Sequence, residues 1–534
     1  MYDLLHDPLI GVRTPAGAQR LSLPGLLAAL SAGQVDGYTG LRAHQADPWH
    51  VFLVQLAASI QARRPTDVLP TDATYWREGL LDLADGIPEA WQLVVEDVTK
   101  PAFMQHPWKS WEAEAGDYGV KTSRGQTVFD PKASSPDELD VLVTAKNHDV
   151  KMARTAPETT EAWIYALITY QTFSGYNGAG NYGSIRMNGG FGCRTVLRWT
   201  DTGNPSERFV DETGLLQSLR QSTCGLFGYA KRGVALTWLS VWNRSNHQYL
   251  VNQVEPWFIE AVRPLRIRHL GNGQLVALGA TSKARQIGPK HLDSGDIGDP
   301  WIVIKVGDEQ HSALDVTKAA GFDVKLLTNI LFEDGFKLGP LQKPRQTEAC
   351  AWFTGSAVAR EKRKGNTEGF HRFEIPVPAK ARRALLQKEN RESLGKLGQQ
   401  LLGDAKDVQR ALATALTVLS EGGPDKADFE RVETWIKAAR ADFAKTWEQH
   451  YFPTLWRGAD EAHEAVRRDW QQRLVEAGQA LFDEAATRLP LPSNRRWRAL
   501  TQAESAWRDM LRKAGLPLPG RPTTETPEPE EQTA

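Results

Sequence analysis

A glycine-rich stretch bordered by basic residues is the part of this sequence whose residue types and spacing could bind a ligand. Residues 174–183 read Ser-Gly-Tyr-Asn-Gly-Ala-Gly-Asn-Tyr-Gly. Glycine allows backbone N–H groups to approach a ligand where a Cβ would collide. Cations flank the stretch along the chain: Lys146, Lys151, Arg154, Arg186, Arg194 and Arg198. This combination favours a nucleic-acid backbone or groove over a small-molecule pocket.

The same glycines allow two other interpretations. Taken alone, Gly175, Gly178 and Gly180 fit an ordinary loop equally well. A dinucleotide-binding loop fits poorly, because the order is G-x-x-G-x-G, the stretch follows the helical run 158–173 instead of a strand, and no helix is signalled directly after it.

No residues stand at the spacing of a familiar catalytic or metal site. The sequence contains no H-x-x-x-H, no H-x-E followed by C-x-x-C, no G-x-S-x-G and no P-loop. The widely spaced cysteines Cys193, Cys224 and Cys350 support neither a disulfide framework nor a structural zinc site. We therefore predict no catalytic residue, no metal and no cofactor. The alternative is a metal-dependent nuclease that uses His148, Asp149 and further carboxylates.

Length and charge limit the classes of protein that remain. A chain of 534 residues is expected to form two or three domains. The formal net charge of −1 argues against a protein that coats bare DNA by itself, but it allows one local basic site. The N-terminal segment carries Asp3 and Asp7 and lacks the basic residues with which a signal peptide begins. The apolar run 51–60 is too short to cross a bilayer. These features predict a cytoplasmic protein.

Four short blocks of sequence resemble one known family. They are Met1–Arg13, Pro101–Gln105, Leu139–Asp149 and Gly175–Gly183. In these blocks the chain is similar to CasA, the large subunit of the type I-E CRISPR surveillance complex Cascade. The similarity runs from Met1 to about Gly515, with divergent stretches between the blocks.

The resemblance implies a non-catalytic subunit of an RNA-guided antiviral complex. Members of this family read the protospacer-adjacent motif (PAM) from the minor groove of target double-stranded DNA and help to start strand separation and R-loop formation. They then provide a platform for a helicase-nuclease, while the guide RNA reads the rest of the target. The implied partners are other Cascade subunits, crRNA, target double-stranded DNA and the helicase-nuclease, with no membrane.

The resemblance also assigns roles to individual residues. The loop that touches the 5′ handle of the crRNA corresponds to Ala145, Lys146, Asn147 and His148. The loop that contacts the PAM corresponds to Gly175, Asn177, Gly178, Ala179, Gly180 and Asn181. The family inserts a lysine from a separate loop, for which we choose Lys283, with Lys290 as the alternative. The helical domain would lie along the DNA, where Arg495 and Arg496 are candidate contacts.

The family also has a hairpin wedge, often with a glutamine, that parts the DNA strands. Its tip corresponds to the stretch 354–357, which contains Thr354, Gly355 and Ser356 and no glutamine. Two strands, Cys350–Ala359 and Gly369–Val377, are predicted to flank the basic run Arg360–Lys364 as an extended hairpin. A solvated turn explains this basic run slightly better than a nucleic-acid contact does.

The periodicity of the chain predicts an α+β fold with two domains. Residues 1–377 form a large mixed domain, which includes a core helix over Trp49–Arg64 and a helix over Trp257–Pro264. Residues 378–515 carry four apolar stripes at helical spacing, which is typical of a four-helix bundle with its tryptophans, Trp497 included, in the core. The first stripe ends at Gly422, and the second ends at Tyr451–Pro453. The acidic, Pro-rich tail 516–534 is expected to be disordered.

Overall fold

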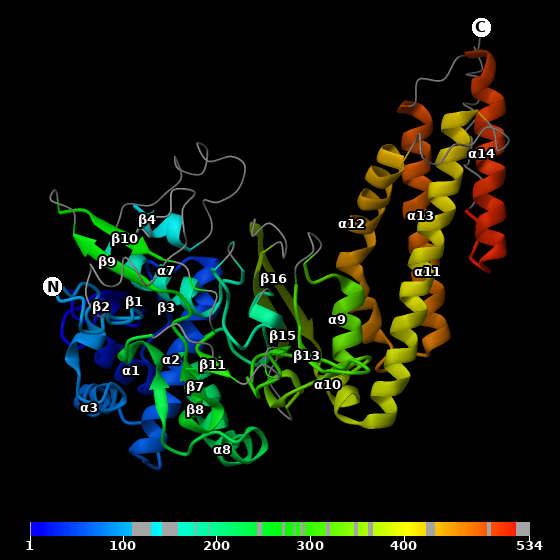
Figure 1. The fold of residues 1–534 in the computed structure, drawn as a ribbon. Coiled ribbons are helices and arrows are strands. Elements are labelled where there is room, and N and C mark those ends of the chain that lie inside the picture. Colours follow the sequence, from blue (N-terminus) through cyan, green and yellow to red (C-terminus); the bar gives the residue numbers. More distant parts are fainter. Residues whose placement is uncertain are drawn as a thin grey trace, which may run out of the picture. The chain divides into compact units, whose positions relative to one another are not determined.

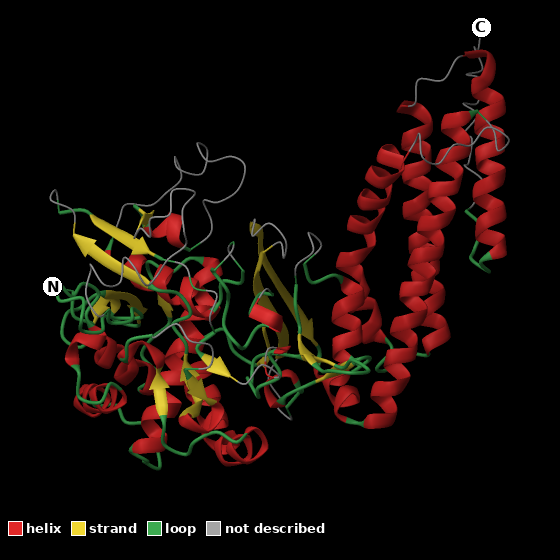
Figure 2. Ribbon diagram, viewed as in Figure 1, coloured by secondary structure: helices red, strands yellow, loops and turns green. Residues whose placement is uncertain are grey.

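The computed structural model describes most of the chain. It covers residues 2–108, 130–140, 159–316, 321–345, 351–360, 367–422, 433–488 and 493–519, except 177, 179, 191, 243–247, 270–272, 281, 283–284, 289–291 and 293. The chain forms two compact units, of which the first is Met1–Asp323 with Glu333–Pro376 and the second is Val324–Phe332 with Val377–Ala534. The first unit mixes helices and strands, and the described part of the second is helical (Figures 1 and 2).

Helix α2 (Ala43–Arg63) runs through the core of the first unit. The sequence predicts it as a core helix, and all its residues from Trp49 to Gln61 are buried. Four helices pack against it or against one another around it: α1 (Leu23–Ser31), α3 (Ala73–Leu83), α7 (Thr160–Thr172) and α8 (Pro205–Phe227). Burial on every side explains why α2 is apolar around most of its circumference.

Several small sheets surround these helices. In strand order they are β2 (Gly17–Leu21)–β1 (Ile10–Thr14)–β3 (Gly37–Tyr38); β4 (Asp130–Ala133)–β10 (Leu275–Gly279)–β9 (Leu265–His269); β13 (Ser312–Ala313)–β12 (Ile304–Lys305)–β14 (Phe336–Lys337); β16 (Thr367–Val377)–β15 (Ala351–Arg360)–β5 (Val196–Thr200); and the pairs β11 (Ile287–Gly288)–β7 (Tyr249–Leu250) and β6 (Val234–Leu236)–β8 (Val254–Ile259). The predicted pair of long strands around the basic run is confirmed, because β15 and β16 are consecutive, paired neighbours.

The prediction of a helix over Trp257–Pro264 is wrong. The segment contains the end of β8, whose six residues are all buried and which pairs with β6 in parallel. A strand covered on both faces has a continuous apolar sequence, so its periodicity does not separate it from a buried helix.

The second unit is built around one long helix, α11 (Lys388–Glu421). The helices α12 (Glu433–Arg457), α13 (His463–Arg488) and α14 (Ser493–Lys513) each pack against it, which confirms the predicted bundle of four long helices. α11 ends as predicted, because Gly422 takes a left-handed φ of 79° and its N–H donates to the carbonyl of Val418.

Two shorter helices complete the second unit: α9 (Val324–Leu331) and α10 (Ala379–Leu386). The predicted domain 1–377 includes α9, but α9 packs against α11. Thr328 Oγ1 donates to the Tyr451 hydroxyl, and this hydroxyl donates to the carbonyl of Gly398 on α11, both at 3.0 Å. This buried chain of hydrogen bonds explains why a segment from the middle of the sequence belongs to the bundle.

Three details of the bundle differ from the predictions. α12 does not end at Pro453 but continues to Arg457, since the buried Tyr451 and Leu455 on either side of the proline are held by packing. Trp497 is 80% exposed, because α14 faces the bundle with Ala499, Ala503, Trp507 and Leu511, and Trp497 lies off that stripe. Leu516, assigned to the tail, is buried. Among the described helices, none is long and apolar enough to cross a membrane.

Candidate nucleic-acid site around the glycine loop

Helix α7 carries the chain into the glycine loop, defined as residues 174–183. Thr159 caps the helix by accepting a hydrogen bond from Ala162 N at 3.1 Å. Nearly all the α7 side chains are buried, and the helix packs against α2. The loop therefore starts from a point fixed in the core of the first unit.

The two ends of the glycine loop touch each other. A Cβ added to Gly183 would lie 3.2 Å from the Cα of Gly175 and 3.2 Å from the carbonyl oxygen of Gly190. Gly183 N also donates to that oxygen at 2.8 Å. A side chain at Gly183 would also lie 2.3 Å from Met187 Sδ, so these neighbours would have to move, and glycine favours the closed base of the loop.

Two left-handed glycines shape the tip of the loop. Gly178 has a φ of 89° and Gly180 a φ of 77°. Asn181 N donates to the carbonyl of Gly178 at 3.0 Å, which closes a turn. A Cβ on Gly178 would meet no atom within 4 Å, so the chain faces open space there. Asn177 and Ala179 lie outside the described residues.

Arg263 fixes the start of the loop. Its side chain is 1% exposed and donates to the carbonyls of Tyr170, Ser174 and Gly175, and its guanidinium carbon lies 4.3 Å from the centroid of the Tyr170 ring. Gln171 Nε2 donates to the Arg263 carbonyl at 3.0 Å. The last carbonyls of a helix have no partner within the helix, and Arg263 supplies one from a distant part of the chain.

A second loop is joined directly to the tip. Ser282 N donates to the carbonyl of Gly180 at 2.8 Å, and Ser282 forms a parallel bridge with Asn181. The predicted cation Lys283 is the next residue, although its own position, like that of Lys290, lies outside the described residues. The structure thus brings together two segments that lie about a hundred residues apart, and both are segments that the resemblance assigns to PAM contact.

Glu260 supports the chain that follows the glycine loop. Its carboxylate accepts hydrogen bonds from Ser184 Oγ at 2.7 Å and from Ile185 N at 3.0 Å. Burial raises the pKa of Glu260, while these hydrogen bonds and the nearby Arg285 act in the opposite direction. Nothing in the sequence around Glu260 or Arg263 signals these supporting roles, because each depends on contacts across long separations.

Two of the predicted cations do not contribute exposed charge. Arg186 and Arg194 are 2% and 1% exposed, and both donate to Asp299 Oδ2, at 3.3 Å and 2.6 Å. Their guanidinium groups also lie over aromatic rings, Arg186 at 4.4 Å from the Phe258 centroid. Burial lowers the pKa of Arg194 to about 10, although Asp299 opposes the shift. The prediction that they surround the glycine backbone with charge is wrong, because both are buried and share Asp299 as an ion-pair partner inside the unit.

The same correction applies to Arg198 on β5. It is 2% exposed and pairs with Asp47 at 2.8 Å and with Glu212 at 3.2 Å. The other cations of the predicted set, Lys146, Lys151 and Arg154, lie outside the described residues.

The predicted RNA loop, 145–148, also lies outside the described residues, but the chain on both sides of it is anchored. Before it, the buried Asp140 carboxylate accepts a hydrogen bond from Gln45 Nε2 at 2.5 Å and pairs with His44 Nε2 at 2.7 Å. After it, Glu161 Oε1 accepts hydrogen bonds from Gly11 N at 2.7 Å and from the Tyr165 hydroxyl at 2.9 Å.

The placement of the wedge tip at residues 354–357 is wrong. Thr354, Gly355 and Ser356 lie in the middle of β15, opposite residues of β5. Glycine stands at position 355 because a Cβ there would lie 2.5 Å from the Phe373 ring and 2.9 Å from the carbonyl oxygen of Val196. It marks close packing instead of a turn. The connection between β15 and β16, residues 361–366, lies outside the described residues.

The predicted cations of the bundle are exposed. Arg495 and Arg496 lie near the start of α14, followed by the exposed Trp497 and Arg498. We call residues 495–498 the basic–aromatic patch. An exposed tryptophan between arginines offers a stacking surface next to positive charge, a combination found in proteins that bind single-stranded nucleic acid.

Within the part of the chain that the structure describes, no three His, Cys, Asp or Glu side chains are grouped to hold a metal ion. His148 and Asp149, the pair on which the nuclease alternative depends, lie outside it.

Comparison with known proteins supports the fold. No family model matches the chain, and no curated protein matches it in sequence. Solved structures do match. CasA from Thermus thermophilus aligns over 96% of this chain and 99% of its own, with a TM-score of 0.61 at 13% identity. Cse1 from Acidimicrobium ferrooxidans aligns over 96% and 98%, with a TM-score of 0.60 at 13% identity.

A third structure agrees with these two. Cse1 from Thermobifida fusca covers 96% of this chain and 97% of its own, with a TM-score of 0.59 at 12% identity. CasA and Cse1 are two names for one kind of protein. The chain therefore has the CasA fold along nearly its whole length, and the α+β architecture predicted from the sequence is confirmed.

Proposed function

We propose that this chain is the large, non-catalytic subunit of a type I-E CRISPR interference complex. In this role it binds the crRNA-bearing assembly, reads the PAM of target double-stranded DNA, helps to start R-loop formation and provides a platform for a helicase-nuclease. The observation that carries the proposal is the hydrogen bond between Ser282 N and the Gly180 carbonyl, since it places the chain next to Lys283 against the tip of the glycine loop.

A site of this kind suits the minor groove. The groove is narrow and shows mainly a difference between A·T and G·C pairs, so proteins read it with close backbone contacts and an inserted cation. The open face at Gly178 allows such an approach, and Lys283 would supply the cation. Arg263 and Gly183 hold the loop in one shape, which lowers the entropy lost when it binds.

The first test concerns assembly with RNA. Lys146→Ala combined with Asn147→Ala should raise the Kd for the crRNA-bearing complex about tenfold or more, because the variant loses one cationic contact and one amide contact with the RNA. The full-length chain can be titrated against the complex that lacks it, with binding followed by biolayer interferometry.

Lys305→Ala provides the control, because Lys305 is an exposed lysine of β12. It removes the same charge and should bind like the parent. If the double variant also binds like the parent, the RNA contact is misassigned.

The second test concerns the basic–aromatic patch, which we propose contacts DNA during R-loop formation. Charge reversal at Arg495 and Arg496 should weaken R-loop formation and make its salt dependence shallower, because each lost phosphate contact lowers the slope by about 0.7–0.9. Trp497→Ala should weaken binding by about 1–3 kcal/mol with the slope unchanged, because stacking is not electrostatic. Gel-shift titrations over a range of salt concentrations measure both quantities.

Arg512→Glu is the matched control for the charge reversal. Arg512 lies at the other end of α14, is 64% exposed and pairs only with the exposed Asp509 among the described residues. A parental salt slope in the Arg495→Glu, Arg496→Glu variant would show that the patch does not contact DNA.

A further inference from the structure

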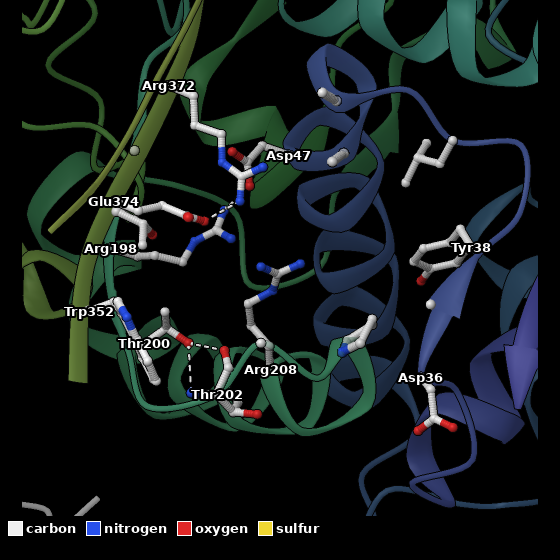
Figure 3. Close-up of a pocket in the computed structure, with 18 of the residues that line it drawn as sticks. Asp36, Tyr38, Asp47, Arg198, Thr200, Thr202, Arg208, Trp352, Arg372 and Glu374 are labelled. Atoms are coloured by element: carbon white, nitrogen blue, oxygen red, sulfur yellow. Dashed lines mark hydrogen bonds and ion pairs between the residues drawn. The ribbon is translucent and has the colours of Figure 1, made fainter. Parts of the chain in front are cut away.

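The first unit contains a cavity of about 540 Å³ that none of the glycine-loop residues line. Its walls come from the segment around β3, the first turns of α2 and α8, strand β5 with the loop after it, and strands β15 and β16 (Figure 3). This volume is typical of pockets that hold small organic ligands.

Four arginines line the cavity, and two of them are neutralised by neighbouring carboxylates. Arg198 pairs with Asp47 at 2.8 Å, and Arg372 pairs with Glu374. Asp47 also accepts a hydrogen bond from Ser356 Oγ, so its lone pairs are shared between two donors. These pairs account for the charge on one side of the cavity.

The other two, Arg13 and Arg208, make no side-chain hydrogen bond or ion pair with any residue that the structure describes. The Nε atom of Arg208 is shielded from solvent and has no acceptor among those residues. Burial and the charge of Arg198 lower the pKa of Arg208, which Asp47 and Glu212 offset only in part. Arg208 is partly exposed to the cavity, and an anion bound beside it would supply the acceptor that its Nε lacks.

The other residues that line the cavity favour a nucleotide over a simple anion. Trp352 and Tyr38 lie on opposite sides of the arginines (Figure 3) and offer apolar ring surface. Asp36 also lines the cavity and can accept a hydrogen bond from a hydroxyl or amino group. Inorganic phosphate would use only the arginines, whereas a nucleotide would use all three kinds of wall.

We propose that this cavity binds the phosphate of a nucleotide, either free or at the 5′ end of a nucleic-acid strand. Arg208 and Arg13 hold the phosphate, and Trp352 lies against the base. Arginine suits this role because its planar donors match two phosphate oxygens at once. The site is separate from the glycine loop and does not depend on the function proposed above.

The test uses the full-length chain and five probes: AMP, adenosine, inorganic phosphate, a dinucleotide with a 5′-phosphate and the same dinucleotide without it. Isothermal titration calorimetry should show saturable binding of AMP or of the phosphorylated dinucleotide, weaker binding of phosphate, and none of adenosine. Preference for AMP identifies a free nucleotide as the ligand, and preference for the phosphorylated dinucleotide identifies a strand end.

Variants connect the binding to the cavity. Arg208→Gln should weaken binding at least tenfold, and Arg13→Gln, at an exposed position that disturbs the fold little, should weaken it several-fold. Trp352→Leu should weaken AMP binding but not phosphate binding. Arg232→Gln, which removes a 69% exposed arginine outside the cavity, should change nothing. The proposal is overturned if the parent binds none of the phosphorylated probes, or if Arg208→Gln and Arg13→Gln both bind like the parent.

Discussion

Gly178→Val and Gly180→Val should each abolish binding to a double-stranded target without affecting binding to the crRNA-bearing assembly. A branched side chain at the tip would hold the backbone away from the floor of the minor groove. Lys283→Ala should cost about 1–3 kcal/mol and relax discrimination among PAM sequences, which is the scale of one base contact. Gel-shift titration of the assembled complex on duplexes with different PAMs measures both effects.

Backbone strain is the main confounding factor, since valine at a φ of 89° is strained wherever it occurs. Gly86→Val controls for it, because Gly86 has a φ of 77° and no atom within 4 Å of where a Cβ would lie, but belongs to the turn after α3. Gly86→Val and Gly178→Val should lose similar stability, and of these two only Gly178→Val should lose duplex binding. A target opened beforehand should bind the loop variants almost normally. Equal losses on duplex and opened targets would show that these glycines hold the fold and do not read DNA.

The sequence predicted well those elements whose signal is local. The apolar spacing of α2 and the left-handed stop at Gly422 belong to single segments, and both are confirmed. The β15–β16 pair is confirmed for the same reason, because two strand-like runs flank a short polar connection. An apolar stripe at helical or strand spacing predicts which residues are buried, even when the element that packs against them is unknown.

The errors arose where a residue's role depends on distant partners. The sequence predicts exposed cations at Arg186, Arg194 and Arg198. Their counter-ions, however, are distant in the sequence, as in the pairing of Arg198 with Asp47. The resemblance places Gly355 at the tip of the hairpin wedge, whereas in the structure a Cβ there would lie 2.5 Å from the Phe373 ring. The type of a residue does not show whether its side chain is exposed to solvent or buried in the core. Its tertiary contacts decide that.

The candidate site shows the same division. The sequence located the glycine loop and, through the resemblance, the loop that contains Lys283. It gave no sign that Arg263 holds one end or that Ser282 is joined to Gly180. Hydrogen bonds between backbone atoms leave no trace in side-chain composition, because any residue except proline can donate them.

The largest effect on stability is expected at Asp299. Asp299→Ala should lower the free energy of unfolding of the first unit by about 3–5 kcal/mol, because it leaves Arg186 and Arg194 buried without their shared carboxylate. That is a large part of the total stability of a typical domain, about 5–15 kcal/mol. The backbone N–H of Trp301 would also lose its acceptor, Asp299 Oδ1, at 3.1 Å. Urea denaturation followed by tryptophan fluorescence measures the change.

A matched control and a double variant separate charge from packing. Asp211→Ala removes an exposed carboxylate that pairs with Arg345, so it should cost no more than about 1 kcal/mol. Arg194→Met combined with Asp299→Ala should be less destabilising than the sum of the single changes, because methionine removes the charge that Asp299 neutralises. Strict additivity would mean that the loss comes from packing.

Because Arg186 directly follows the chain held by Glu260, Asp299→Ala should also impair duplex binding, but with a much larger loss of stability than Gly178→Val causes.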